Sequence, residues 1–245
     1  MSYPYFFVDA GSAGENEIKI GGEDLNHLKN VLRARVGDLV YVSDSQEFKY
    51  RTEVTSIGRS EIKLSIKNRE KIIPKSPGIV LFQCALKKNS MEFVIQKSTE
   101  IGVDKIVPVT SERVVSGSKK VSGKIKRWQK ISDGASKQCK RDFKCEVSLP
   151  VDIGHIDVSE YDFFFIPYEK STAYNKSLIG SRRSISNASK AAFLIGPEGG
   201  FSDDEVSSLE SKGAIEIKLG ENIYRSETAA IYFLSVLDYL IGSRK

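Results

Sequence analysis

Two glycine-containing loops near the end of the chain carry residues suited to binding a ligand. The first spans 195–202 (IGPEGGFS) and the second spans 219–228 (LGENIYRSET). Each follows a short apolar segment typical of a strand and precedes a helical pattern. Glycines let the backbone approach a ligand closely, and open α/β sheets bind ligands outside the carboxyl ends of their strands. The loops therefore predict one cofactor site; the alternative for the first loop is a tight turn without a ligand.

The start of the helix after the first loop is well specified. Ser202 and Glu205 have the S-x-x-E spacing of a capping box, and Phe201 and Val206 stand at the staple positions. The first turn, 203–205, is acidic, although anions are what a helix N-terminus attracts. A cationic ligand or a neutral nucleoside therefore fits better than a phosphate. The sequence lacks a P-loop and an early G-x-G-x-x-G fingerprint, which disfavours ATP and dinucleotides.

The helix expected after the second loop, 229–241, is apolar almost all round. Ser226 is expected to cap it, and Glu227 favours its N-terminal dipole. A helix of this kind must be covered on every side. It is either a central core helix or the interface of a homodimer.

Composition is that of an ordinary globular protein, with 40% hydrophobic and 28% charged residues in a chain of 245. No apolar run is long enough for a membrane helix, and the N-terminus lacks the features of a signal peptide. Three cysteines without a CxxC pair favour a reducing compartment, so a cytoplasmic location is expected. Neither histidine has a neighbour at metal-ligand spacing, and no metal is expected.

A basic stretch between residues 119 and 144 is the clearest charge asymmetry, because only Asp133 and Asp142 are acidic there. Such a stretch is either a phosphate-contacting face or a solvated helix face. Its basic residues are Lys119, Lys120, Lys124, Lys126, Arg127, Lys130, Lys137, Lys140, Arg141 and Lys144.

The chain divides into two regions of different pattern. Up to about residue 68 it has short β-branched and aromatic segments separated by glycines, at 5–8, 17–20, 39–42, 48–57 and 61–66. One helix, about 23–34, interrupts them, with Leu25, Leu28, Val31 and Leu32 on one face. These features predict a small β-barrel. A linker is expected at 68–78.

From residue 79 onward, strands alternate with helices, which predicts an α/β domain with a parallel sheet. Helices are expected at 89–102 and 123–139. The expected strands span 79–85, 105–109, 146–149, 162–167, 191–195 and 215–219.

The two loops together closely resemble the signature of the SPOUT-class RNA methyltransferases, and within them the RsmE family. The resemblance covers nearly the whole chain. The similar segments are 195–206 (IGPEGGFSDDEV), 219–234 (LGENIYRSETAAIYFL), 27–33 (HLKNVLR) through Gly37-Asp38, 96–102 (QKSTEIG) to 111–113 (SER), and 128–131 (WQKI) to 138–141 (QCKR).

The resemblance implies a PUA-like β-barrel that binds RNA, over 1–70, and a SPOUT trefoil-knot methyltransferase domain, over 71–245. It implies S-adenosyl-L-methionine (SAM) as cofactor, an obligate homodimer, and methylation of uridine N3 in 16S ribosomal RNA, within the small subunit. Asn222 and Tyr224 stand where the family generally has a basic and an aliphatic residue.

The resemblance also implies the site residues. SAM is expected on Tyr168, Leu194, Gly196, Pro197, Glu198, Gly199, Gly200, Leu219, Gly220, Ile223 and Tyr224. Arg225 is the first candidate for stabilising an anionic uracil, with Glu227 and Thr228 second; a salt bridge alone is the alternative for Arg225. The expected RNA contacts are His27, Arg33, Arg113 and Arg141, against a packing role for the histidine and a plain surface position for each arginine.

Two other functions remain open at this point. A SPOUT enzyme acting on transfer RNA or another base would also bind SAM but would act on a different RNA. A non-catalytic RNA-binding ribosome assembly factor, built from the barrel and the basic helix, would bind RNA with a steep salt dependence and ignore SAM.

Overall fold

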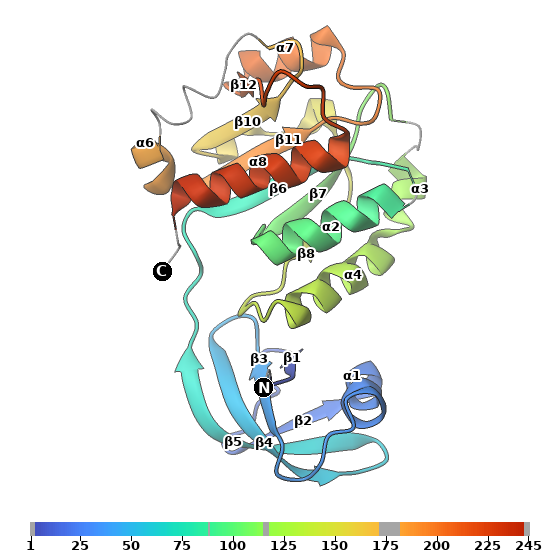
Figure 1. The fold of residues 1–245 in the computed structure, drawn as a ribbon, viewed down its shortest axis with the longest axis vertical. Helices are drawn as coiled ribbons and strands as arrows, with labels where there is room; N and C mark the ends of the chain where they lie inside the picture. The colour runs from blue at the N-terminus through green and yellow to red at the C-terminus, as the bar shows by residue number, and fades with distance from the viewer. Residues whose placement is uncertain (1–2, 88, 115–117, 172–181, 243–245) are drawn as a thin grey trace. The chain divides into compact units, whose positions relative to one another are not determined.

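A computed structural model describes residues 3–87, 89–114, 118–171 and 182–242 (Figure 1). The chain forms two compact units. The first comprises 1–74 and 136–144, and the second comprises 75–135 and 145–245. The segment 136–144, which the sequence assigned to the later domain, is held in the first unit by hydrogen bonds. Ser43 Oγ donates to the Asp142 carbonyl (2.6 Å), and Lys137 Nζ donates to Asp24 (2.5 Å).

The first unit contains one curled sheet of five strands in the order β1-β3-β4-β5-β2. Only β1 and β3 are parallel; the other pairs are antiparallel. Two register shifts between β4 and β5 bend the sheet around a buried core, because a bulge increases the local twist. The strands are β1 (Tyr5–Phe7), β2 (Glu17–Gly21), β3 (Leu39–Ser43), β4 (Phe48–Ile57) and β5 (Glu61–Lys71). Because β5 reaches Lys71, the predicted linker began too early.

The prediction of a single α-helix over 23–34 is wrong. A short helix α1 (Gly22–Asn26) changes into a π-helical turn at His27–Val31, where Leu32 N donates to His27 O five residues back (2.9 Å). The wider turn shifts the phase of the side chains. Leu28 is fully buried, but Val31 and Leu32 are 63% and 44% exposed, so they do not share its face.

The second unit is built on a sheet in which every pair of strands is parallel, as the alternating pattern predicted. The order is β12-β10-β11-β6-β7-β8, and β9 also pairs with β7. The strands are β6 (Gly78–Cys84), β7 (Lys105–Thr110), β8 (Glu146–Val147), β9 (Val151–Asp152), β10 (Phe163–Pro167), β11 (Lys190–Ile195) and β12 (Ile215–Ile217). The sequence did not predict β9, which has only two residues.

Helices cover both faces of this sheet because its strands bury alternate residues on opposite sides. Ile79 and Leu81 face a core with α2, α4 and α8, whereas Val80 and Phe82 face a core with α7 and two 3-10 turns (Figure 1). The helical segments are α2 (Asn89–Ile101), α3 (Ser118–Ser122), α4 (Ile125–Gln138), the 3-10 turns Ile153–His155 and Val158–Glu160, α6 (Arg182–Ser186), α7 (Asp203–Ser211) and α8 (Ser226–Ile241).

The chain order places a switch in direction beside β6. From β6 the chain builds β7 and β8 on one side, and later places β11 against the other side. Ligands in open α/β sheets bind at the carboxyl ends of strands next to such a switch. The predicted glycine loop, 195–202, leaves β11 at that end.

Helix α8 has one buried and one exposed face within the single chain. Ala230, Phe233 and Leu237 are fully buried, whereas Tyr232 is 39% and Tyr239 is 75% exposed. The chain itself therefore covers only part of this apolar helix. Among the described residues, no helix is long and apolar enough to cross a membrane, and none of their His, Cys, Asp and Glu side chains group into a metal site.

Candidate active site

Two adjoining cavities open at the carboxyl ends of β10, β11 and β12, beside the two glycine-containing loops. The larger has a volume of about 580 Å³ and the smaller about 270 Å³. Volumes of several hundred Å³ are typical of small-molecule sites. The residues that line both cavities are Pro167, Glu169, Ile223, Tyr224 and Ala229. The shared wall makes the cavities two parts of one candidate site.

The loop between β11 and α7 begins its helix as the sequence predicted. Glu205 N donates to Ser202 Oγ (3.3 Å), and Ser202 N donates to Glu205 Oε2 (2.9 Å), which completes the capping box. Phe201 and Val206 are both buried in the core on that side of the sheet. The end of the loop is therefore fixed by its own sequence.

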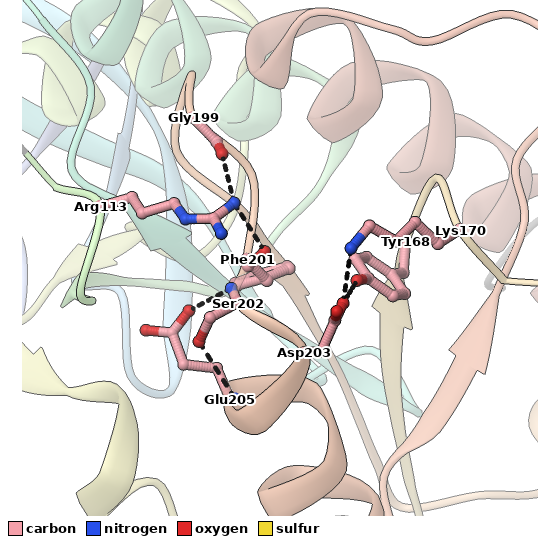
Figure 2. A network of polar contacts seen from close by, with 8 residues as sticks. All are labelled: Arg113, Tyr168, Lys170, Gly199, Phe201, Ser202, Asp203 and Glu205. Carbon is pink, nitrogen blue, oxygen red and sulfur yellow. Dashed lines mark hydrogen bonds and ion pairs between the residues drawn. The ribbon is translucent and has the colours of Figure 1, made fainter.

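The middle of this loop is held by the segment after β7 (Figure 2). Arg113 Nη1 donates to the carbonyl oxygens of Gly199 (3.0 Å) and Phe201 (3.1 Å). The neighbouring Glu112 N donates to Glu205 Oε1 (2.9 Å). These partners are 86 to 93 residues apart in the chain. No pattern of neighbouring residues could therefore predict these contacts.

A third tie comes from the segment after β10. Asp203 Oδ1 accepts hydrogen bonds from Tyr168 Oη and from Lys170 Nζ, the latter at 2.7 Å (Figure 2). The Lys170 ammonium and then the Tyr168 hydroxyl lower the pKa of Asp203. Burial, and then the hydrogen bond to Asp203, raise the pKa of Tyr168. Asp203, one of the acidic residues in the first turn of α7, is thus paired with Lys170 of the same chain.

Three glycines keep the walls of the site open. A Cβ atom on Gly196 would lie 3.1 Å from the Phe201 ring, and one on Gly220 would lie 3.0 Å from Tyr224 Oη. Gly200 has φ +68°, and its Cβ would meet Glu169 Oε1 at 3.2 Å. A side chain at any of these positions would have to displace its neighbour by a few tenths of an ångström, so glycine lets the backbone pack closely against these side chains.

The second loop is arranged around its own tyrosine. Tyr224 places its hydroxyl against Gly220, and its ring lies 5.3 Å from the Tyr232 ring of α8. Next to it, Ile223 is 82% exposed although it lines both cavities. This arrangement uses residues close in sequence, in contrast to the first loop.

Ser226 joins the two loops in a way the sequence did not predict. Arg225, not Ser226, is the N-cap residue of α8, and it provides no side-chain cap. Ser226 Oγ instead donates to the Gly196 carbonyl (2.5 Å) and accepts from Gln83 Nε2 (3.0 Å). The expectation that Ser226 caps the helix is therefore wrong, because its hydroxyl already bonds across to the first loop.

Most of the predicted cofactor and catalytic residues lie around the cavities. Leu194 is fully buried in the core, and it and exposed Thr228 line neither cavity. Tyr168, Leu219 and Gly220 line the smaller cavity, and Ile223 and Tyr224 line both. The larger cavity alone is lined by Gly196, Pro197, Glu198, Gly199, Gly200, Arg225 and Glu227.

The four predicted RNA contacts have different surroundings. His27 and Arg33 are exposed in the first unit, and the His27 ring lies 5.8 Å edge-on from Phe6, as a packing histidine would. Arg141 is half-buried, and its Nε donates to Phe143 O (3.2 Å). Arg113, in the segment after β7, donates to the Gly199 carbonyl of the first glycine-containing loop.

The basic stretch is partly committed to ion pairs. Arg127 pairs with Glu92 (2.8 Å), and Lys137 pairs with Asp24 (2.5 Å). Lys126, Lys130 and Lys140 are exposed, whereas the side chain of Lys119 lies outside the described residues. Trp128 and Ala135 are buried on the opposite side of α4, so Lys126 and Lys130 lie on its outer face, and Lys140 follows the end of the helix.

Sequence reasoning missed two side chains at the site, Gln83 and Glu169, and the structural role of a third, Glu198. Gln83 bonds to Ser226 from the end of β6, Glu198 accepts from Lys87 N (3.0 Å), and Glu169 borders both cavities. Glu198 was expected only as a cofactor contact, not as a tie between loops. The one signal in the sequence for Gln83 was its place as a polar residue near the end of an apolar strand.

Family models match both units. An RNA methyltransferase domain matches residues 74–238, and an RNA methyltransferase PUA domain matches residues 20–67. A Legionella pneumophila structure described as a putative methyltransferase in complex with bound SAM has a TM-score of 0.84, 26% identity and 97% coverage of each chain. Together with the parallel sheet and its cavities, these matches define an RNA methyltransferase with an N-terminal PUA domain.

Two curated relatives narrow this class further. The chain is 34% identical to the ribosomal RNA small subunit methyltransferase E of Mesomycoplasma hyopneumoniae, over 94% of this chain and 96% of the relative. It is 30% identical to the protein of the same name from Buchnera aphidicola, over 92% and 89%. The chain belongs to the ribosomal RNA small subunit methyltransferase E family.

Proposed function

We propose that the protein binds SAM between the two loops and transfers its methyl group to N3 of a uridine in 16S ribosomal RNA. The observation that carries this proposal is the open site between glycine backbones at the carboxyl ends of β11 and β12, with Arg225 at its edge. The family and the SAM-bound Legionella relative support it.

The residues present fit SAM. A cavity of about 580 Å³ accommodates a nucleoside-sized ligand. Glu169 and Glu227 supply negative charge on its lining, which suits a sulfonium. Bound SAM would supply a methyl group on a positively charged sulfur. The backbone of the loops 196–200 and 219–224 would hold it, with Tyr168 bordering the smaller cavity.

Arg225 is the residue we propose for stabilising the uracil as its N3 loses a proton. It lies at the N-terminus of the 16-residue helix α8, where the helix dipole also favours negative charge. A fixed cation at the site of developing charge lowers the barrier without reorganisation. Glu227, which lines the cavity, and Thr228 are the second candidates, for orienting Arg225 or the base.

The remaining parts of the proposal concern assembly and RNA. Residues 1–70 act as the RNA-binding module and 71–245 as the SPOUT methyltransferase domain, whose trefoil knot stays a prediction. His27, Arg33 and Arg141, with the exposed lysines of α4, contact the RNA.

The exposed face of α8 pairs two chains into a homodimer, since it carries Tyr232 and Tyr239. The enzyme works in the cytoplasm on the small ribosomal subunit.

Two measurements test this function. Mass mapping of 16S ribosomal RNA from a deletion strain should show the loss of one methyl group from one uridine. Calorimetry should show SAM binding to the purified protein, and Gly199→Val should abolish it. A protein that ignores SAM but binds RNA would be a non-catalytic assembly factor. A missing methyl group on another RNA or base would identify a different SPOUT enzyme.

A further inference from the structure

Arg113 has an unusual position for an exposed arginine near an RNA-modifying site. Its side chain is exposed, yet one guanidinium nitrogen donates to two carbonyl oxygens of the β11–α7 loop, at 3.0 and 3.1 Å. Hydrogen bonds from a charged donor are about twice as strong as neutral ones. The contact therefore stabilises the conformation of this loop from within the protein itself.

The two carbonyls flank the residue that gives the loop its shape. Gly200 has φ +68°, and its N–H donates to Pro197 O (3.0 Å), which closes a turn. Arg113 binds the carbonyls on either side of this glycine, those of Gly199 and Phe201. The orientation of the peptide groups at the tip is thus fixed from outside the loop.

The stem of Arg113 forms the other half of the contact. A Cβ atom on Gly199 would lie 3.4 Å from Arg113 Cβ and 3.6 Å from its Cδ. The methylene groups therefore lie directly behind the backbone that lines the larger cavity. The adjacent Glu112 N, bonded to Glu205, fixes the same segment at the start of α7.

We infer that Arg113 is a positioning residue that holds the loop 196–201 in its SAM-binding shape, and that it is not a contact for RNA phosphate. The inference rests on the proposed function and goes beyond it by reassigning this arginine. This side chain links the segment after β7 to a loop 86 residues further along the chain, and that loop lines the larger cavity.

The test compares Arg113→Met with Lys212→Met. Lys212 is a matched control, because it is also an exposed cation that donates to a backbone carbonyl, that of Gly154 (2.9 Å), at the other end of α7. Calorimetry with SAM should give a dissociation constant about tenfold or more above wild type for Arg113→Met. Lys212→Met should bind SAM as wild type does.

A second readout separates positioning from RNA binding. The affinity for purified 16S ribosomal RNA is measured across salt concentrations without SAM, for wild type and both variants. A lost phosphate contact reduces the slope of log affinity against log salt by about one. We expect no change of slope for Arg113→Met. Thermal unfolding of each variant checks that the chain is folded, and Arg113→Lys, which keeps the positive charge but replaces the guanidinium with an ammonium, should show a smaller loss of SAM affinity.

The outcomes are distinct. Unchanged SAM affinity in folded Arg113→Met, or a salt slope reduced by one, would overturn the inference while the proposed function stands. Failure of the wild-type protein to bind SAM would overturn the proposed function and the inference with it.

Discussion

The glycine turn of the first loop and the tyrosine of the second loop are held by different kinds of contact. The loop after β11 is fixed by Arg113, Glu112 and Lys87, which lie 86 to 111 residues away in the sequence. The loop after β12 is arranged around Tyr224, which contacts Gly220 and Tyr232 nearby. The first is a preformed wall, whereas the second places Arg225 at the start of α8. We infer that affinity for the cofactor depends mainly on the first loop and catalysis on Arg225 in the second.

The largest effect on SAM binding is expected from a substitution inside the first loop that disrupts its packing. Gly196→Val would place its Cβ 3.1 Å from the buried Phe201 ring, so the ring or the loop must move. We expect SAM binding to be lost in calorimetry while circular dichroism shows a folded protein. Tight SAM binding by this variant would show that the wall need not be rigid.

Removing Arg225, the cation of the second loop, should separate catalysis from binding. Arg225→Ala should lower kcat by roughly 10²-fold to 10³-fold, as the loss of one group that stabilises a developing anion does. Its dissociation constant for SAM should stay near that of wild type. Single-turnover methylation of 16S ribosomal RNA measures the rate, and an equal loss of SAM affinity would contradict the division between the loops.

Ser226 connects the two loops, so its removal tests whether they act together. Ser226→Ala removes the donor to the Gly196 carbonyl and leaves buried Gln83 without this partner. An unsatisfied buried group costs about 1–3 kcal/mol of unfolding free energy. Ser235→Ala is the control on the same helix, because Ser235 is exposed and its Oγ donates to Ile231 O within that helix. Equal urea unfolding curves for the two variants would argue against a link through Ser226.

The second loop should tolerate change better than the first. Gly220→Ala would bring a Cβ to 3.0 Å from Tyr224 Oη, the far end of a side chain that can move. We expect SAM affinity to fall only a few-fold, or about 1 kcal/mol, and Tyr224→Phe added to it should restore part of the loss. Complete loss of binding in the single variant would show that both loops are equally rigid.

The smallest effect concerns pH. Because Lys170 and Tyr168 lower the pKa of Asp203, the Asp203 carboxylate adds stability above its ordinary pKa of about 3.9. That stability is lost as the pH falls through the lower pKa of the folded protein. Melting temperatures of wild type and Asp203→Asn should therefore differ slightly at pH 7 and converge below about pH 4. A difference that grows in acid would contradict the assignment.

The sequence predicted features that depend on nearby residues. Strand β4 spans 48–57 as expected, and the capping box of Ser202 and Glu205 is present. Both follow from patterns within a few residues, namely alternation along a strand and S-x-x-E spacing. The strand-end positions of the two glycine loops were predicted for the same reason.

What the sequence could not predict depends on partners far along the chain. Arg113 reads as a surface arginine until the carbonyls of Gly199 and Phe201 are placed beside it. The place of 136–144 in the first unit likewise follows from tertiary contacts, which override local propensity. The π-helical turn at 27–31 was not predicted either.

The most direct test of the account is a crystal structure of the protein with SAM. The account predicts SAM between the loops 196–200 and 219–224, with the Arg113 contacts to Gly199 and Phe201 unchanged and Arg225 facing the methyl group. SAM bound elsewhere, or bound only after the first loop has left Arg113, would contradict the claim that this loop is a preformed wall of the active site.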